Sequence, residues 1–89
     1  MSVDRRGYVV RLRGLPFSTS AEEVVQFLTD RGSALVEIVR GVGGVTFMFS
    51  PEGKPTGEAL VELQDEASMR MALRRHKEML GSRFIELVG

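Results

Sequence analysis

Arginine and phenylalanine side chains occur close together at two places far apart in the chain. Arg13 and Phe17 lie in one short segment, and Arg83 directly precedes Phe84. A guanidinium is a planar fork of donors that suits the O6 and N7 acceptors of guanine, and a flat ring can stack on a base. These residue types therefore indicate binding of nucleic-acid bases, provided that the fold brings the two places together.

Two lysines complete the set of candidate binding residues. Lys54 lies in a segment rich in proline and glycine, and Lys77 precedes Arg83 and Phe84. An ammonium group holds a phosphate as a point charge without reading the base. Plainer interpretations stand beside these: a solvated or paired charge for Arg13, turn solubility for Lys54, and a loop plug packed on the core for Phe17.

The charge balance excludes a general coat for nucleic acid. Twelve basic residues balance twelve acidic ones among 89 residues. Because phosphate neutralisation supplies non-specific affinity, a general nucleic-acid surface would be strongly basic. Any nucleic-acid site in this chain must therefore be local.

Length and composition predict one ordinary globular domain. Apolar residues make up 43% and charged residues 27% of the chain, as in typical globular proteins. We expect a flexible N-terminal segment over residues 1–7 and a single domain over residues 8–88. There is no cysteine and one histidine, so no disulfide, metal site or cofactor is expected. The apolar runs are too short to span a membrane, and no membrane partner is expected.

Hydrophobic periodicity predicts elements in the order β-α-β-β-α-β. The predicted strands cover residues 8–14, 45–49, 58–63 and 83–88, and the predicted helices cover residues 21–30 and 66–77. Ser20 and Glu23 form a capping box before the first helix, and Asp65 is the expected N-cap of the second. The connection over residues 31–44 shows no clear period. We expect it to be long and partly ordered, with residues 40–44 mobile.

The second helix is expected to present one apolar stripe and one solvated face. The stripe consists of Met69, Ala72, Leu73 and His76. Arg74 and Arg75 are expected to coat the solvated face.

This order of elements predicts an α+β, ferredoxin-like fold in which four strands form one antiparallel sheet with both helices on one face. The open face would carry Glu58, Leu60 and Glu62 at its centre, where Arg11 is expected to pair with Glu58 or Glu62. Carboxylates repel phosphate, and the centre has no ring for stacking. The candidate residues lie instead at one rim, in the loop after the first strand, the turn before the third and the start of the last.

Three separated blocks of the sequence resemble the quasi-RNA-recognition motifs of the heterogeneous nuclear ribonucleoprotein F/H family. They read VVRLRGLPFS, GKPTGEALVEL and HKEMLGSRFIEL, and they span most of residues 8–88. The second block has the outline of the longer ribonucleoprotein signature, with Glu58, Leu60 and Leu63 at its aromatic positions. The resemblance implies binding of guanine-rich single-stranded RNA through loops instead of the sheet, in splicing or RNA processing.

The resemblance also implies which residues bind RNA and where the protein acts. By their match to the family's motifs, the RNA-binding residues are Arg13, Phe17, Lys54, Lys77, Arg83 and Phe84. Phe84 stands where the family has tyrosine, and the connection over residues 31–44 is longer than is usual in the family. A nuclear location is implied, with a monomeric domain inside a longer multi-domain protein and other ribonucleoproteins as further partners.

Two other classes of function fit the same fold. A protein-interaction module with little RNA affinity would suit the exposed Met48 and Leu60 and the long connection. An enzyme on a split β-α-β scaffold would need a positioned acid, base or nucleophile, and the sequence offers no such constellation. We therefore expect a binding module and not an enzyme.

Overall fold

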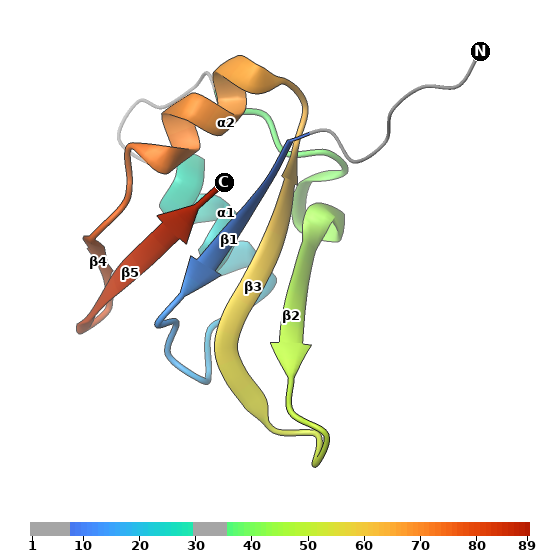
Figure 1. Ribbon diagram of the computed structural model, residues 1–89, viewed down its shortest axis with the longest axis vertical. Helices are drawn as coiled ribbons and strands as arrows, with labels where there is room; N and C mark the ends of the chain where they lie inside the picture. Colours follow the sequence, from blue (N-terminus) through green and yellow to red (C-terminus); the bar gives the residue numbers. More distant parts are fainter. Residues whose placement is uncertain (1–7, 30–35) are drawn as a thin grey trace.

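One antiparallel sheet with two helices against one of its faces forms the fold (Figure 1). The computed structural model describes residues 8–29 and 36–89. The expected N-terminal segment over residues 1–7, and the first part of the connection, lie outside the described residues. In the described residues the strand order is β2-β3-β1-β5-β4. The strands are β1 (Tyr8–Arg13), β2 (Val45–Phe49), β3 (Pro55–Leu63), β4 (Glu78–Leu80) and β5 (Arg83–Val88), and the helices are α1 (Ala21–Thr29), η1 (Gly41–Gly44) and α2 (Glu66–Leu73).

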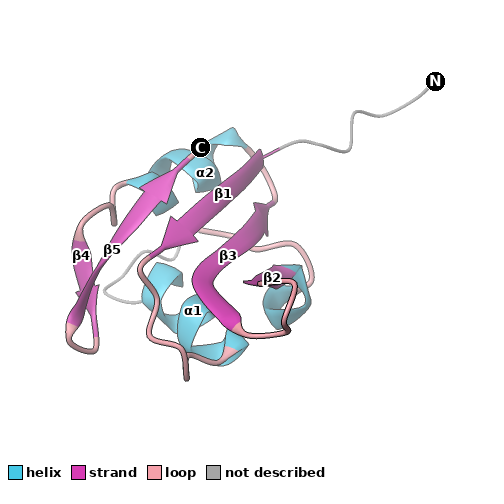
Figure 2. Ribbon diagram, turned by 60° about the horizontal axis from the view of Figure 1, so that its bottom comes forward, coloured by secondary structure: helices cyan, strands magenta, loops and turns pink. Residues whose placement is uncertain are grey.

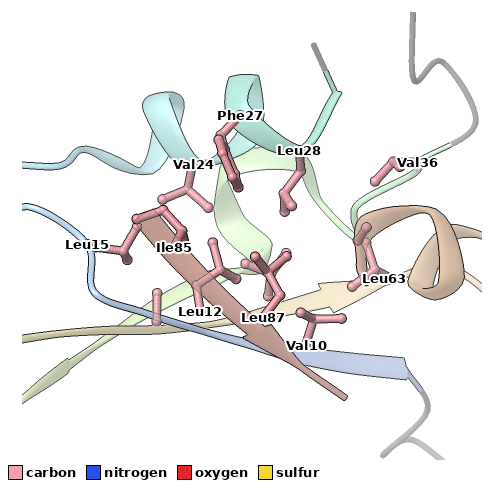
Figure 3. Close-up of a cluster of buried hydrophobic side chains, with 13 residues drawn as sticks. Val10, Leu12, Leu15, Val24, Phe27, Leu28, Val36, Leu63, Ile85 and Leu87 are labelled. Carbon is pink, nitrogen blue, oxygen red and sulfur yellow. The ribbon is translucent and has the colours of Figure 1, made fainter. Parts of the chain in front are cut away.

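The core lies between the sheet and the helices, as the alternating pattern predicts. Alternate residues of the three central strands point toward α1, which contributes Val24, Phe27 and Leu28 (Figure 3). The strand residues are Val10 and Leu12 of β1, Ala59, Val61 and Leu63 of β3, and Ile85 and Leu87 of β5. Because side chains alternate across a strand, the residues between them form an open face on the other side of the sheet.

The predicted helix starts are confirmed by their caps. Ser20 Oγ accepts a hydrogen bond from the Glu23 amide at 3.2 Å, and a Glu23 carboxylate oxygen accepts one from the Ser20 amide at 2.8 Å. Asp65 accepts a hydrogen bond from the Ser68 amide at 2.8 Å. These contacts satisfy amide donors that a helix start leaves without partners inside the helix.

The prediction of four strands is wrong, because β4 is a fifth strand at the edge of the sheet. β4 pairs antiparallel with β5, with Leu80 opposite Arg83. The two-residue loop between them is Gly81–Ser82, and Gly81 has a φ of 63°. A glycine followed by serine between two apolar segments is typical of a tight hairpin. This signal indicates the extra strand, which the predicted order of elements did not include.

The second helix is shorter than the predicted range of 66–77, because it ends at Leu73. After it, the amides of Arg74, Arg75 and His76 bond to carbonyls three residues back, which tightens the chain into turns. Lys77 then adopts a φ of 69°, and its amide donates to the Ile85 carbonyl at 2.7 Å. The chain has thus joined the edge of β5 where a helix was expected.

Arg75 and His76 also differ from the prediction. Arg75 is 6% exposed instead of solvated; its guanidinium lies 5.9 Å from the centre of the Phe27 ring and donates to Glu78 at 2.9 Å. His76 is exposed and does not belong to the packed stripe. Its Nδ1 accepts a hydrogen bond from the Leu87 amide at 3.0 Å, beyond the end of β4. His76 therefore satisfies a donor on the edge of β5 that β4 is too short to reach.

The described part of the connection has a defined backbone conformation, also over residues 40–44, whose mobility stays a prediction. Gly41–Gly44 form η1, and Gly44 is buried. A Cβ on Gly44 would stand 2.2 Å from the Val39 carbonyl oxygen, so only glycine fits this close approach. Val39 donates to the Glu62 carbonyl at 2.9 Å, which attaches the connection to β3.

Candidate functional site

A groove of about 660 Å³ opens at the end of the sheet where β1 finishes and β5 begins. Its volume is typical of sites for small ligands. β1, β3, β5 and the turn after α2 all contribute to its walls. The lining residues are Arg13, Gly14, Thr56, Glu58, Lys77, Phe84 and Glu86.

Strand register places three charged residues in a row across this groove. Arg13 of β1 lies opposite Glu58 of β3 on one side and opposite Glu86 of β5 on the other. The Arg13 Nε atom is 3.7 Å from a Glu58 carboxylate oxygen, which is an ion pair but too long for a hydrogen bond. An exposed pair of this kind contributes about 0–1 kcal/mol, so a ligand can displace it.

The cross-strand pairs expected for Arg11 are wrong. Arg11 lies opposite Leu60 on β3 and opposite Val88 on β5. Glu58 pairs with Arg13, and Glu62 pairs with Arg40 of the connection at 3.6 Å. Without RNA, Arg13 is therefore a paired charge, as the plainer interpretation had it. Both members of the pair line the groove.

Two glycines bring the loop after β1 close to its neighbours. Gly14 has a φ of 89°, and a Cβ there would meet the Phe84 carbonyl oxygen at 3.0 Å. Gly57 has a φ of 83°, and its carbonyl accepts a hydrogen bond from the Leu15 amide at 2.9 Å. These are backbone positions that suit glycine and resist other residues. They fix Phe17 near β3 and Arg13 near β5.

The two phenylalanines of the predicted site are exposed. Phe17 has 66% and Phe84 67% of its surface exposed, so the interpretation of Phe17 as a plug in the core is wrong. A ring carbon of Phe17 lies 3.5 Å from where a Cβ of Gly57 would be. The Phe17 ring thus lies beside Gly57, and both rings leave most of their surface open to a ligand.

Lys77 owes its position in the groove to its backbone. A φ of 69° is uncommon for a residue with a side chain. Here the chain turns from α2 toward β4, and the hydrogen bond to Ile85 holds that turn beside β5. The side chain of Lys77 thereby lines the groove with Arg13 and Phe84.

Phe17, Lys54 and Arg83 lie outside the groove lining. Lys54 is exposed in the turn between β2 and β3, where its amide donates to Ser50 Oγ at 3.2 Å. Arg83 begins β5 two residues before the buried Ile85, so its side chain belongs to the opposite face of the sheet from Phe84. Figure 2 shows the loop after β1 between the β4–β5 hairpin and the β2–β3 turn. The structure thus gathers three of the six predicted residues in one groove and leaves three around it.

The sequence reading did not assign four groove residues to the site: Gly14, Thr56, Glu58 and Glu86. Glu58 was predicted on the open face, as one of the carboxylates that repel phosphate. The alternation of β3 and β5 predicts that face correctly, but the register that places both glutamates beside Arg13 is set by pairing between distant strands. In the described residues, no group of three or more histidine, cysteine or carboxylate side chains could hold a metal ion. None of the described helices is long and apolar enough to cross a membrane.

Comparison with protein families gives a match over nearly the whole chain. The family model described as RRM domain matches residues 10–89. Heterogeneous nuclear ribonucleoprotein H2 of Mus musculus is 45% identical over 83 residues, and heterogeneous nuclear ribonucleoprotein H of Homo sapiens is 42% identical over 81 residues. These alignments cover 93% and 91% of this chain. The chain spans 17% of the length of each of these relatives.

Solved structures agree with this comparison. The crystal structure of G-rich RNA sequence binding factor 1 from Homo sapiens superposes with a TM-score of 0.83 at 32% identity, covering 91% of this chain and 77% of that chain. The crystal structure of the Glorund qRRM2 domain gives a TM-score of 0.79 at 31% identity, covering 90% of this chain and 84% of that one.

Proposed function

The chain belongs to the family of RRM domains, with heterogeneous nuclear ribonucleoproteins H and H2 among its relatives, and from this premise we propose that it binds single-stranded, guanine-rich RNA. The contacts are made by the rim of the sheet instead of its open face. The role is in pre-mRNA splicing or another step of RNA processing, as a binding module and not as an enzyme.

The observation that carries this proposal is the groove itself. It combines a guanidinium from Arg13, an ammonium from Lys77 and the exposed ring of Phe84. A fork of donors suits the O6 and N7 acceptors of guanine, a ring stacks on its face, and an ammonium holds a phosphate. The name of one structural neighbour, G-rich RNA sequence binding factor 1, is consistent with the same ligand.

The middle of the open face lacks groups that could stack on bases, which favours RNA binding at the rim. Among the described residues it presents Arg11, Thr46, Leu60 and Glu62, none of which has a ring. Stacking on a ring contributes about 1–3 kcal/mol for each base, and this surface cannot supply it. The ring of Phe84 is on this face of β5, but it lies at the rim and not in the middle.

The remaining residues of the predicted site extend the contact beyond the groove. Phe17, Lys54 and Arg83 are exposed around it, and we assign them to nucleotides on either side of the guanine in the groove. The ring of Phe17 stacks a base and Lys54 holds a phosphate. Arg83 approaches from the helix-covered side of β5.

The relatives' names and lengths supply the cellular setting of the proposal. Heterogeneous nuclear ribonucleoproteins H and H2 carry a nuclear location in their names, and we place this chain in the nucleus. Because it spans 17% of their length, we take it to act as one monomeric domain of a longer protein that works with other ribonucleoproteins.

An NMR titration of the isotope-labelled domain tests the proposal. Short G-rich, A-rich, U-rich and C-rich RNAs are added separately, each too short to fold. G-rich RNA is expected to bind best, with shifts concentrated at residues 13–18, 52–56 and 77–84. Equal responses to U-rich and G-rich RNA, or shifts centred on Thr46, Leu60 and Glu86 alone, would exclude the rim as a guanine site.

A further inference from the structure

The groove contains a negatively charged side chain, Glu86, that would not help a surface whose only task is to attract RNA. Glu86 is exposed, carries a negative charge and lines the groove beside Arg13 and Phe84. Building on the RNA-binding function proposed above, we propose that Glu86 determines specificity: its carboxylate accepts hydrogen bonds from the N1–H and N2–H groups of a guanine whose O6 is bound by Arg13.

The register of the strands places donor and acceptor side by side. Arg13 and Glu86 are directly opposite each other on neighbouring antiparallel strands. Opposed residues of such a pair project to the same face with their Cβ atoms about 4.5–5.5 Å apart. Phe84 precedes Glu86 by two residues and therefore shares that face. A base stacked on Phe84 thus has a guanidinium and a carboxylate within reach of one edge.

A donor followed by an acceptor complements the hydrogen-bonding edge of guanine but not that of the other bases. Along its Watson–Crick edge guanine presents the acceptor O6 and then the donors N1–H and N2–H. Adenine presents a donor amino group and then the acceptor N1, so the same pose would put donor against Arg13 and acceptor against Glu86. Cytosine also begins with a donor, and uracil has one donor between two acceptors. A pairing of guanidinium and carboxylate therefore selects guanine by its hydrogen-bonding pattern.

Glu58 has the same chemistry but a different position. It already forms the 3.7 Å ion pair with Arg13, and its side chain is 31% exposed. Among the described residues Glu86 forms no ion pair or side-chain hydrogen bond, so its two oxygens are free to accept from a base. Glu58 is therefore already paired, and Glu86 is the carboxylate left to read the base.

The negative charge of Glu86 gives a second reason to assign it a role in base specificity. A carboxylate beside a bound polyanion lowers its affinity for every sequence, because it repels phosphate. Donors on a base offset that repulsion, since hydrogen bonds to an ionised acceptor are stronger than those between neutral groups. Glu86 therefore weakens binding of RNA in general and strengthens binding of guanine relative to other bases.

The test compares guanine with inosine, which lacks the N2 amino group but keeps O6, N7 and N1–H. Affinities of a short G-rich RNA and of its inosine counterpart are measured by fluorescence anisotropy for the unaltered domain, Glu86→Gln and the control Glu58→Gln. Both variants remove one negative charge from the groove. Amide NMR spectra of each variant verify that the fold is retained.

We expect the unaltered domain to favour guanine over inosine by about tenfold, the value of one hydrogen bond to a charged group. Glu86→Gln should reduce this ratio to about twofold or less, because the amide replaces one acceptor by a donor. Glu58→Gln should keep the ratio near that of the unaltered domain. A ratio unchanged in Glu86→Gln, or lost in Glu58→Gln, would overturn the role of Glu86 while leaving G-rich binding intact. No preference for G-rich RNA in the unaltered domain would instead refute the proposed function itself.

Discussion

The side chains at the rim have different roles in RNA binding, which follow from their chemistry. Phe17 and Phe84 expose about two thirds of their surfaces, 66% and 67%, although apolar rings are normally among the most buried groups. Their exposure beside cationic side chains is what a stacking surface for bases requires. Lys54 and Lys77 contribute charge, which attracts any sequence, so rings and charges are separable by mutation.

Replacing Phe17 by alanine should weaken binding of G-rich RNA by about 1–3 kcal/mol, because one stacked base loses its ring. The fold should persist, since the side chain is 66% exposed. Isothermal titration calorimetry measures the loss. Tyr8→Ala, at the opposite end of β1, removes another exposed ring and should leave the affinity unchanged. Equal losses in the two variants would show that Phe17 is not a stacking residue.

Replacing Lys54 by alanine should weaken binding of all RNA sequences alike, because a point charge on phosphate does not read the base. The dependence of log affinity on log salt should flatten by roughly one ion. Affinities are measured at several salt concentrations for G-rich and U-rich RNA. Arg70→Ala, on α2 and ion-paired with Glu66, is the control with the same change in charge. A loss confined to G-rich RNA would contradict this role for Lys54.

At the scale of elements, the loop after β1 and the turn after α2 are the parts that shape the site. The first is held by Gly14 and Gly57 against the neighbouring strands. The second is held by Arg75, buried between α1 and the start of β4. Both are local departures from regular structure, and both lie next to side chains that line the groove.

Gly57→Ala should destabilise the domain by more than Gly53→Ala. Both glycines have a φ near 84°, where a side chain costs about 1–2 kcal/mol. A Cβ on Gly57 would also stand 3.1 Å from the Leu15 carbonyl oxygen, whereas one on Gly53 would have nothing within 4 Å. Urea denaturation measures both variants. Equal stability losses would show that the close approach of the loop to β3 adds no constraint.

Arg75→Ala should lower the free energy of unfolding by about 1–3 kcal/mol, since it removes a hydrogen bond to a charged group and the contact with Phe27. The loss stays below that of a fully buried pair, because the Glu78 side chain is 38% exposed and can be hydrated. Arg74→Ala changes an exposed neighbour and should stay within about 0.5 kcal/mol of the unaltered domain. Thermal or urea unfolding distinguishes the two. Similar values for both arginines would refute the structural role of Arg75.

At the scale of the whole molecule, the sheet separates a closed face from an open one. The closed face carries the helices and the core, and the open face carries mixed charges with another, smaller groove along Val9, Arg11, Leu60 and Val88. The net charge of the chain is zero, so attraction of RNA depends on where cations gather. We therefore expect a shallow salt dependence, set by few phosphate contacts.

Replacing Leu60 by alanine should leave RNA affinity nearly unchanged, because the centre of the open face makes no base contact. Phe84→Ala, on the same face but at the rim, should weaken binding by the value of a stacked base, about 1–3 kcal/mol. Both affinities are measured on folded variants by fluorescence anisotropy. Loss of binding in Leu60→Ala, with the fold retained, would move the site from the rim to the sheet.

Local patterns in the sequence were enough to predict the types of the main elements, their order and their faces. The alternation in β1, β3 and β5 and the caps at Ser20 and Asp65 are local patterns. Periods of two and near four residues require no knowledge of distant segments. They were sufficient to assign the helix starts and to place Glu58, Leu60 and Glu62 on the open face of the sheet.

The remaining features depend on contacts between segments that are distant in sequence. Arg13 lies between Glu58 and Glu86 because β1 pairs with both β3 and β5 in one register, and no local pattern fixes that register. Arg75 is buried because α1 places Phe27 beneath it. The helix predicted through Lys77 ends early because the hydrogen bond to Ile85 and the pairing of β4 with β5 replace helical bonds over these residues. At the end of this helix, contacts formed across the fold outweigh a local preference of less than about 1 kcal/mol per residue.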